Sequence, residues 1–366
     1  MKLAVVSLKG KSSEMIARAG AKYFDKVSSF RLGNIRVDVN KETAVMHESK
    51  NLADYDCVYL RGSYKYVDLL CSIAIGLQGK VYMPLSAESF FIGHNKFLTE
   101  VKLKEENILF PSTHLVYKTE IAKELVNKLH YPVVFKILAG TQGKGVMFAE
   151  SLESANSLID MLAKLKEPYM IQEFVETGAT DIRALVIGNN IVSMERAAKQ
   201  GELRAGIHSG GEGKKIDLTY EDKQLAKKTA RALGTDICGV DMLKGATKTV
   251  VTEVNLSPGI IGLTRATNVN VADKIASYLY KKTEEFIKEE KQKAMNNFDL
   301  SISSLKSSKN SKGKEVLSNL MIKAGRIILP ASLTEISDFE PGENVKIKVE
   351  KGKVEIKKAK KVKIGK

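Results

Sequence analysis

Three oxygen-bearing side chains lie close together in the sequence near residue 250. Asp241 belongs to the apolar stretch CGVDMLK, and Glu253 and Asn255 belong to VVTEVNL, which follows a short turn. Side chains two positions apart on a strand share a face, so Glu253 and Asn255 point the same way. Asp241 lies on the preceding predicted strand across a short turn and can converge with them. Carboxylate and amide oxygens without His or Cys favour Mg²⁺, with Mn²⁺ as an alternative ion, over zinc. The exposed polar face of a β-hairpin is the other interpretation.

A lysine inside an apolar stretch is the second candidate. Lys136 lies in VVFKIL, where its charge needs a partner. The glycine-rich residues 140–145 follow it, and the backbone N–H groups of such a loop can approach phosphates closely. The spacing is not that of a P-loop. Lys96, at the start of a predicted helix, is a second candidate for phosphate; a hairpin turn and a solvated lysine are the alternatives.

A strand end and three arginines complete the candidates. The segment Gln172-Glu173-Phe174-Val175 ends a predicted strand and can present backbone donors and acceptors to the edge of an adenine. Arg183, Arg196 and Arg204 lie on or beside predicted strands with acids close in sequence. They are candidates for carboxylate or phosphate recognition, and surface ion pairing is the alternative.

The elements that must position these residues are of two kinds. Apolar runs at 2–8 and 57–60 alternate with helical patterns at 14–24 and 67–77, which predicts a small α/β layer. From residue 94 the pattern predicts an α+β arrangement of antiparallel sheets with packed helices, ending in a helix over 271–295. We therefore predict an α/β domain over 1–93, a catalytic domain over 94–295, a flexible linker over 296–314 and a small β-module over 315–366.

Composition limits the partners. The net charge is +15, and residues 301–366 hold 16 Lys and Arg against 7 Asp and Glu, so most of the excess lies in the tail. No apolar run is long enough to cross a membrane, and the N-terminus reads as a strand and not as a signal peptide. The three cysteines have no metal-ligand spacing and fit a reducing compartment. We expect a cytoplasmic protein that does not bind a membrane.

Taken in order, the motifs resemble the ATP-grasp superfamily, and within it the RimK-like amino-acid ligases. The resemblance covers about residues 94–290. Besides Lys96 it rests on seven blocks: 135–146 (FKILAGTQGKGV), 171–175 (IQEFV), 181–188 (DIRALVIG), 195–204 (ERAAKQGELR), 208–211 (HSGG), 239–241 (GVD) and 253–259 (EVNLSPG). It implies an ATP-grasp fold preceded by an additional α/β domain.

The resemblance also implies roles for individual residues. The implied ATP-binding residues are Lys96, Lys136, Gly140, Gln142, Gly143, Gly145, Glu173, Phe174, Asp181 and Arg204. Among them, Glu173 and Phe174 hold adenine, Asp181 lies near the ribose, and Arg204 approaches the transferred phosphate. Asp241, Glu253 and Asn255 carry two Mg²⁺ ions, and Arg183, Arg196 and Arg204 are the implied catalytic arginines. One departure is Ala205-Gly206, where relatives carry Ser or Thr and then Asn.

The implied reaction is an ATP- and Mg²⁺-dependent ligation. The γ-phosphate moves to a carboxylate, and an amine then displaces phosphate from the acyl phosphate to form an amide. The amine is expected to be that of L-glutamate, and the acceptor a carboxylate of a protein or small molecule. The alternative is a nucleotide-sensing DNA-binding regulator, with the ATP-grasp as ligand module and the basic tail as effector.

The tail resembles a second family. Residues 321–330 (MIKAGRIILP) and 339–349 (FEPGENVKIKV) are similar to the swapped-hairpin AbrB-type module. The resemblance implies a homo-oligomer held together by this β-hairpin module. Many such modules bind DNA, and Arg326, Lys346 and Lys348 fit that use. A solubilising lysine-rich tail is the plain alternative.

Overall fold

The computed structural model describes residues 1–138, 145–197, 212–305, 321–323, 326–328, 345–350 and 353–358. The chain divides into two compact units, Met1–Phe286 and Ile287–Lys366. The predicted site residues all belong to the first unit. Within the described residues, no helix combines the length and the apolar character that crossing a bilayer requires.

A parallel sheet opens the first unit, as the alternation of strands and helices predicts. Its order is β2-β1-β6, and the residues of β1 after Lys2 are buried because such a sheet is covered on both faces. A small antiparallel sheet, β3-β4-β5, is formed by the part of the chain between β2 and β6. The elements of this N-terminal layer are β1 (Lys2–Ser7), α1 (Lys11–Gly20), β2 (Lys26–Arg31), η1 (Leu32–Asn34), β3 (Arg36–Val39), β4 (Thr43–His47), β5 (Lys50–Asn51), η2 (Leu52–Asp54), β6 (Cys57–Leu60), η3 (Tyr64–Tyr66) and α2 (Val67–Leu77).

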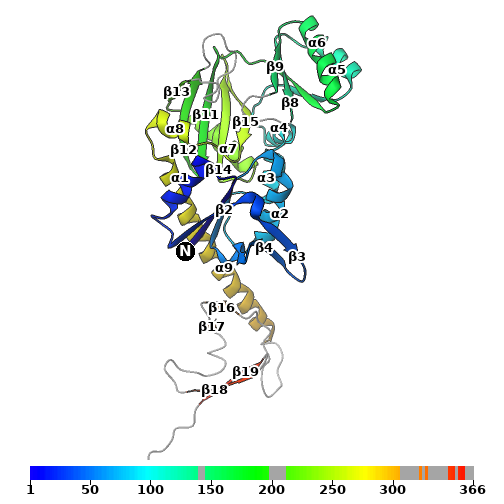
Figure 1. Cartoon of the computed structure of the whole chain (residues 1–366). Coiled ribbons are helices and arrows are strands. Elements are labelled where there is room, and N and C mark those ends of the chain that lie inside the picture. Colours follow the sequence, from blue (N-terminus) through cyan, green and yellow to red (C-terminus); the bar gives the residue numbers. More distant parts are fainter. Residues whose placement is uncertain are drawn as a thin grey trace, which may run out of the picture. The chain divides into compact units, whose positions relative to one another are not determined.

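The first antiparallel sheet, in the order β7-β10-β8-β9, separates its residues by face. Phe135 and Ile171 pack with Ala122 on α5 and with Ile159 on α6 in a core of their own. Lys136 alternates with Phe135 and therefore lies on the opposite face. Figure 1 shows α5 and α6 beside this sheet. Its elements are β7 (Thr113–Val116), α5 (Thr119–Val126), β8 (Val133–Ile137), β9 (Val146–Ala149), α6 (Leu152–Leu162), η4 (Ala163–Leu165) and β10 (Tyr169–Glu173).

The second antiparallel sheet has the order β13-β12-β11-β14-β15. Ala184 of β11 pairs with Val240 of β14, which pairs with Val254 of β15, and this apolar row faces the core. The positions between them carry the polar residues of the predicted site. The elements are β11 (Thr180–Ile187), β12 (Asn190–Ala197), β13 (Glu212–Lys215), α7 (Tyr220–Ala232), β14 (Ile237–Lys244), β15 (Thr249–Asn255), α8 (Ile261–Thr267) and α9 (Val271–Leu305).

One hydrophobic core joins the N-terminal layer to the second antiparallel sheet. Leu3 of β1, Val186 of β11 and Ile275 of α9 belong to the same buried cluster. Two short helices, α3 (Ala87–Gly93) and α4 (Lys96–Glu105), connect the layer to the sheets. Ser89 on α3 donates a hydrogen bond to the carbonyl of Gly234 at 2.8 Å. The core thus crosses the boundary predicted at 93/94, which stays a prediction.

The long C-terminal helix differs from the prediction. α9 continues to Leu305, so residues 296–305, predicted as the start of a linker, are helical. Phe298, Ile302 and Leu305 follow the helical spacing of apolar residues, a signal that the surrounding Ser and Asn residues obscured.

The tail contains the predicted hairpin. β18 (Val345–Glu350) pairs antiparallel with β19 (Lys353–Lys358), which places Ile347 opposite Ile356 and Val349 opposite Val354. A further pair, β16 (Met321–Lys323) and β17 (Arg326–Ile328), is also antiparallel. The identification of these strands with an AbrB-type module stays a prediction.

Gly188, between β11 and β12, should be intolerant of a side chain. Its φ is +56°, and an added Cβ would overlap the ring of Tyr278. We expect Gly188→Ala to lower the free energy of unfolding by about 2–4 kcal/mol, from backbone strain and overpacking together. Urea unfolding followed by circular dichroism measures the change.

The matched control is Gly33→Ala. No atom lies within 4 Å of the Cβ position at Gly33. Its free energy of unfolding should stay within about 0.5 kcal/mol of the wild type. Equal stabilities of the two variants would contradict this account of Gly188.

Candidate active site

The polar face of the second antiparallel sheet brings the three predicted metal ligands onto adjacent strands. Asp241 lies directly opposite Glu253, and Gly239 lies opposite Asn255. A bulge follows Asp241, where Thr252 is skipped by the register and donates from Oγ1 to the Asp241 carbonyl at 3.2 Å. Asp241 is only 6% exposed. An exposed hairpin face therefore does not describe this residue.

Asp241 is held by two arginines on the neighbouring strands. Arg183 donates from Nε and Nη2 to its two oxygens at 2.7 and 2.5 Å, and Arg196 Nη2 lies 3.0 Å from Oδ2. Arg196 also donates to Asp181 at 2.5 and 2.8 Å. Surface ion pairing was the alternative interpretation of these arginines. They do pair with acids, but Arg196 and Asp241 are buried and not at the surface.

The charges of this network fix the ionisation of Asp241. Burial opposes the charged form, but Arg183 and Arg196 outweigh it and lower the pKa of Asp241 to about 2. The carboxylate therefore stays ionised at neutral pH. Arg183, Arg196 and Asp181, predicted to touch substrate or ATP, are arranged here around Asp241.

The donor chemistry of this face fits a divalent cation such as Mg²⁺. It offers two carboxylates and the amide oxygen of Asn255, whose Oδ1 accepts a hydrogen bond from the Ser257 N–H at 3.0 Å. A carbonyl oxygen can accept twice, so a second lone pair is left for an ion. Among the described residues, no group of three or more His, Cys, Asp or Glu side chains could hold a metal. An ion here would therefore use the amide as well as the carboxylates.

Two lysines share the electrostatic environment of Glu253. Lys136 and Lys96 are half-buried, and Lys96 Nζ donates to the Leu138 carbonyl at 3.3 Å. Burial lowers the pKa of both lysines, and the charge of Glu253 acts in the opposite direction on both. The structure thus brings the predicted phosphate lysines near a predicted metal ligand. The charge of Lys136 was predicted to need a partner. In the structure, Glu100 and Glu253 both act on it.

Glu100 on α4 is a residue that the sequence analysis missed. It is 6% exposed, and its Oε1 accepts from Gln172 Nε2 at 2.8 Å. Gln172 Nε2 also donates to Thr113 Oγ1 at 2.7 Å. Burial raises the pKa of Glu100, while Thr113, Lys136 and Gln172 act against that shift. Its spacing of four residues from Lys96, which places both on one helix face, is a signal that could have found it.

The predicted adenine residues lie at the end of β10. The Glu173 N–H donates to the Ser112 carbonyl at 2.9 Å, so this N–H is taken and an adenine would have to use other groups. The ring of Phe174 meets that of Phe148 edge-on at 5.9 Å. Phe174 is half-buried beside this aromatic partner.

Part of the predicted site lies outside the described residues: Gly140, Gln142, Gly143, Arg204 and the departure at Ala205-Gly206. Gly145, the last residue of the glycine-rich loop, is described. Its φ is +81°, and its carbonyl accepts from the Ile137 N–H at 3.0 Å. A Cβ there would lie 3.2 Å from Ile137 Cβ, so the closing position of this hairpin requires glycine.

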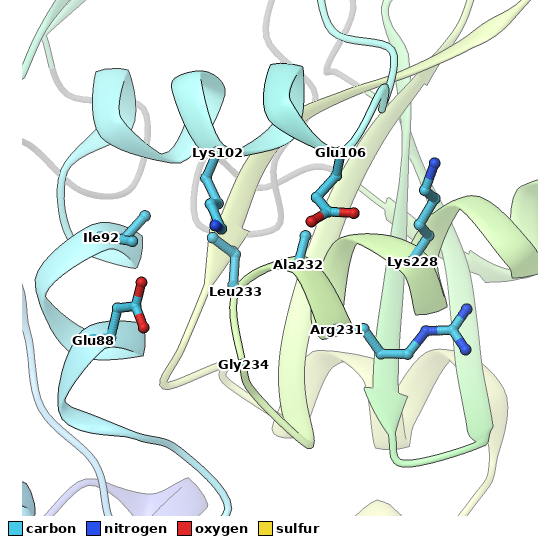
Figure 2. A pocket seen from close by; sticks show the side chains of 9 residues that line it. All are labelled: Glu88, Ile92, Lys102, Glu106, Lys228, Arg231, Ala232, Leu233 and Gly234. Carbon is cyan, nitrogen blue, oxygen red and sulfur yellow. The ribbon is translucent and has the colours of Figure 1, made fainter.

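A cavity of about 610 Å³ lies elsewhere, between α3, α4 and α7. Figure 2 shows acidic Glu88 and Glu106 with basic Lys102, Lys228 and Arg231 around it. None of its lining residues is a predicted site residue. The cavity therefore does not mark the candidate active site.

A protein-family model, the RimK-like ATP-grasp domain, matches residues 93–279, which include both antiparallel sheets and the polar face. The chain belongs to the RimK-like ATP-grasp family. This ATP-grasp ligase is accordingly an ATP-dependent enzyme that forms carbon–nitrogen bonds. The predicted ATP-grasp fold is confirmed.

Relatives and solved structures agree with this family. The probable alpha-L-glutamate ligase of Mannheimia succiniciproducens is 36% identical over 234 residues, covering 63% of this chain and 78% of the relative. That of Alkalilimnicola ehrlichii is 40% identical over 182 residues, which are 49% of this chain and 60% of the relative.

Among solved structures, the ATP-grasp ligase PsnB, complexed with a phosphomimetic variant of its minimal precursor, Mg and ADP, superimposes with a TM-score of 0.62. The superposition covers 77% of this chain and 98% of PsnB at 15% identity, a likeness of fold alone.

Asp241→Asn should destabilise the fold strongly, because it leaves the buried guanidinium of Arg196 and the partly buried one of Arg183 with one carboxylate. We expect the free energy of unfolding, measured with urea in the presence of EDTA, to fall by about 3–5 kcal/mol.

Asp273→Asn is the control for that change, since Asp273 pairs at the surface with Lys22, which is 67% exposed. Its effect should be below about 1 kcal/mol. Similar losses in the two variants would show that the buried network does not have the strength assigned to it.

Proposed function

We propose that this ligase joins the amino group of L-glutamate to a carboxylate of an acceptor, using ATP and Mg²⁺. The observation that carries the proposal is the facing arrangement of Asp241, Glu253 and Asn255 with two half-buried lysines in a RimK-like ATP-grasp domain. The curated relatives named as probable glutamate ligases support the choice of amino acid. The three cysteines are unpaired, which suits a cytoplasmic setting.

The proposed reaction has two steps. The acceptor carboxylate takes the γ-phosphoryl group of ATP, which releases ADP and forms an acyl phosphate. The amine then attacks the acyl carbon, phosphate leaves, and the nitrogen loses a proton to give the amide. Mg²⁺, or Mn²⁺ in its place, supplies charge neutralisation at the phosphoryl oxygens.

The protein residues bind and orient in this scheme. Lys96 and Lys136 bind phosphate oxygens, and Arg204 meets the transferred group. Arg183 and Arg196 each direct Nε and Nη2 at aspartates, so we assign them to holding Asp241 in place and not to contacting substrate. Phe174 borders the adenine, while Gly140, Gln142, Gly143 and Gly145 supply the loop over the phosphates.

The acceptor is proposed to be acidic, and a peptide or protein carboxylate is the first class to test. A net charge of +15 attracts acidic acceptors. The fold neighbour PsnB was solved with a precursor, and a peptide acceptor extends that observation to this chain.

The deciding experiment incubates the protein with ATP, Mg²⁺, single amino acids and a cell extract, and follows ADP release and acceptor mass. We expect a mass gain of one or more glutamate residues. Glu253→Gln keeps the size of the side chain and removes its charge, and it should lower acceptor-dependent ADP release by more than about 100-fold, since losing a direct ligand costs more than losing a supporting group.

Glu195→Gln is the matched control. Glu195 pairs with the core residue Ile182 and thus lies on the opposite face of the same sheet. It should turn over at nearly the wild-type rate. Near-normal turnover by Glu253→Gln would refute the metal assignment, and a mass gain from another amino acid would refute glutamate.

For the tail we propose a homodimer formed by the C-terminal hairpin. Ile347 and Val349 lie on one face of the hairpin and are 56% and 70% exposed. An isolated two-stranded hairpin is marginal in water, and a second copy of the same face would cover both residues.

Deletion of residues 315–366 should turn the dimer into a monomer, so that the mass seen by sedimentation falls from that of two 40.3 kDa chains to that of one shortened chain. The same samples, titrated with duplex DNA at low and high salt, test the alternative role of the basic tail. A shortened protein that still sediments as two chains would contradict the dimer formed by the hairpin, whatever the DNA result.

A further inference from the structure

The loop that follows Asn255 is attached to the N-terminal layer by three hydrogen bonds. Arg61 Nη2 donates to the Pro258 carbonyl at 2.8 Å, and the Gly62 N–H donates to Ser257 Oγ at 2.9 Å. The Ile260 N–H donates to Ser12 Oγ at 3.1 Å. Nearly two hundred residues separate the two sides of the first two bonds, so they join distant parts of one unit.

Arg61 is an unusual group to find buried here. It is 5% exposed, and its other donors go to Ser13 Oγ and Tyr59 Oη, both at 3.0 Å. Every one of these acceptors is neutral, and no acid among the described residues forms an ion pair with Arg61. Burying a charge without an opposite charge is costly, so a purely structural bridge would be better made by a neutral side chain.

Ser257 transmits this attachment to the candidate metal site. Its Oγ accepts from the N-terminal layer, and its N–H donates to Asn255 Oδ1 at 3.0 Å. The side-chain oxygen and the backbone N–H of Ser257 are therefore each committed, one to each side. The direction of the Asn255 amide is set by a residue that the N-terminal layer holds in place.

We propose that Arg61 is a positioning residue: it fixes the loop at Ser257 and Pro258 so that Asn255 presents its amide oxygen to Mg²⁺. The inference rests on the proposed metal site. It gives the N-terminal layer a part in nucleotide binding that is separate from any contact with substrate. A lysine at position 61 keeps the charge but cannot make the three-way set of bonds of a guanidinium.

The test measures ATP binding as a function of Mg²⁺ concentration, without acceptor or amino acid. Arg61→Lys should raise the Mg²⁺ concentration at half-maximal binding about tenfold, the scale of one lost charged hydrogen bond. Ser257→Ala should raise it in the same direction. The double variant should show less than the product of the two single effects, because both act through one loop.

The control is Tyr55→Phe, which removes a hydrogen bond to Ser28 Oγ in the same layer, 2.9 Å long and away from the loop. It should leave the Mg²⁺ midpoint unchanged, and urea unfolding of all variants shows whether stability alone moves it. Wild-type midpoints in Arg61→Lys and Ser257→Ala, or midpoints that follow stability, would overturn the role of Arg61. If the wild type fails to bind ATP with Mg²⁺, the proposed function fails instead.

Discussion

The whole site depends on the balance of charge within two sets of ionisable side chains. Two arginines and two aspartates form one neutral set on β11, β12 and β14. The second set pairs Lys96 and Lys136 with Glu100 and Glu253, again with equal numbers of each sign. Because each set is neutral, a triphosphate alone or a divalent ion alone would leave uncompensated charge beside these partly buried groups. Nucleotide and metal are thus expected to bind together.

The division of the hydrophobic cores determines which part of the site is fixed. The sheet that bears Asp241 shares its core with the N-terminal layer, and Arg61 adds hydrogen bonds at the same junction. The sheet that bears Lys136 has its own core. Moving it relative to the metal ligands would break a few polar contacts, such as that between Glu100 and Gln172, and no large apolar interface within either core. Lys136 can therefore adjust to phosphate while the carboxylates stay in place, together with Lys96, whose helix α4 contributes Leu103 to the shared core.

Sequence patterns predicted the parts of the site that depend on neighbouring residues. The pairing of Asp241 with Glu253 follows from two alternating stretches and a short turn, and the Lys136 environment follows from one lysine on an apolar strand. Arg61 could not be found as a site residue in this way, because its partner Pro258 lies 197 positions away and no local pattern reports such a distance. For Glu100 the local signal was its spacing from Lys96, although its partner Gln172 lies 72 positions away. The arginines were predicted as substrate contacts because a sequence cannot show which acid a guanidinium reaches first.

The hairpin in the tail has two faces that differ in their interaction with water. In the hairpin of β18 and β19, apolar side chains alternate with Lys346 and Lys348, so one face is apolar and the other is basic. Water and Glu350, which pairs with Lys348 at 2.7 Å, suit the charged lysines, but contact with water is unfavourable for Ile347 and Val349. The dimer proposed above would cover this apolar face, whether or not the basic face meets a nucleic acid. The positive charge is the most visible property of the tail in the sequence. In the structure, the exposed apolar side chains and not the lysines are the groups that lack a favourable environment.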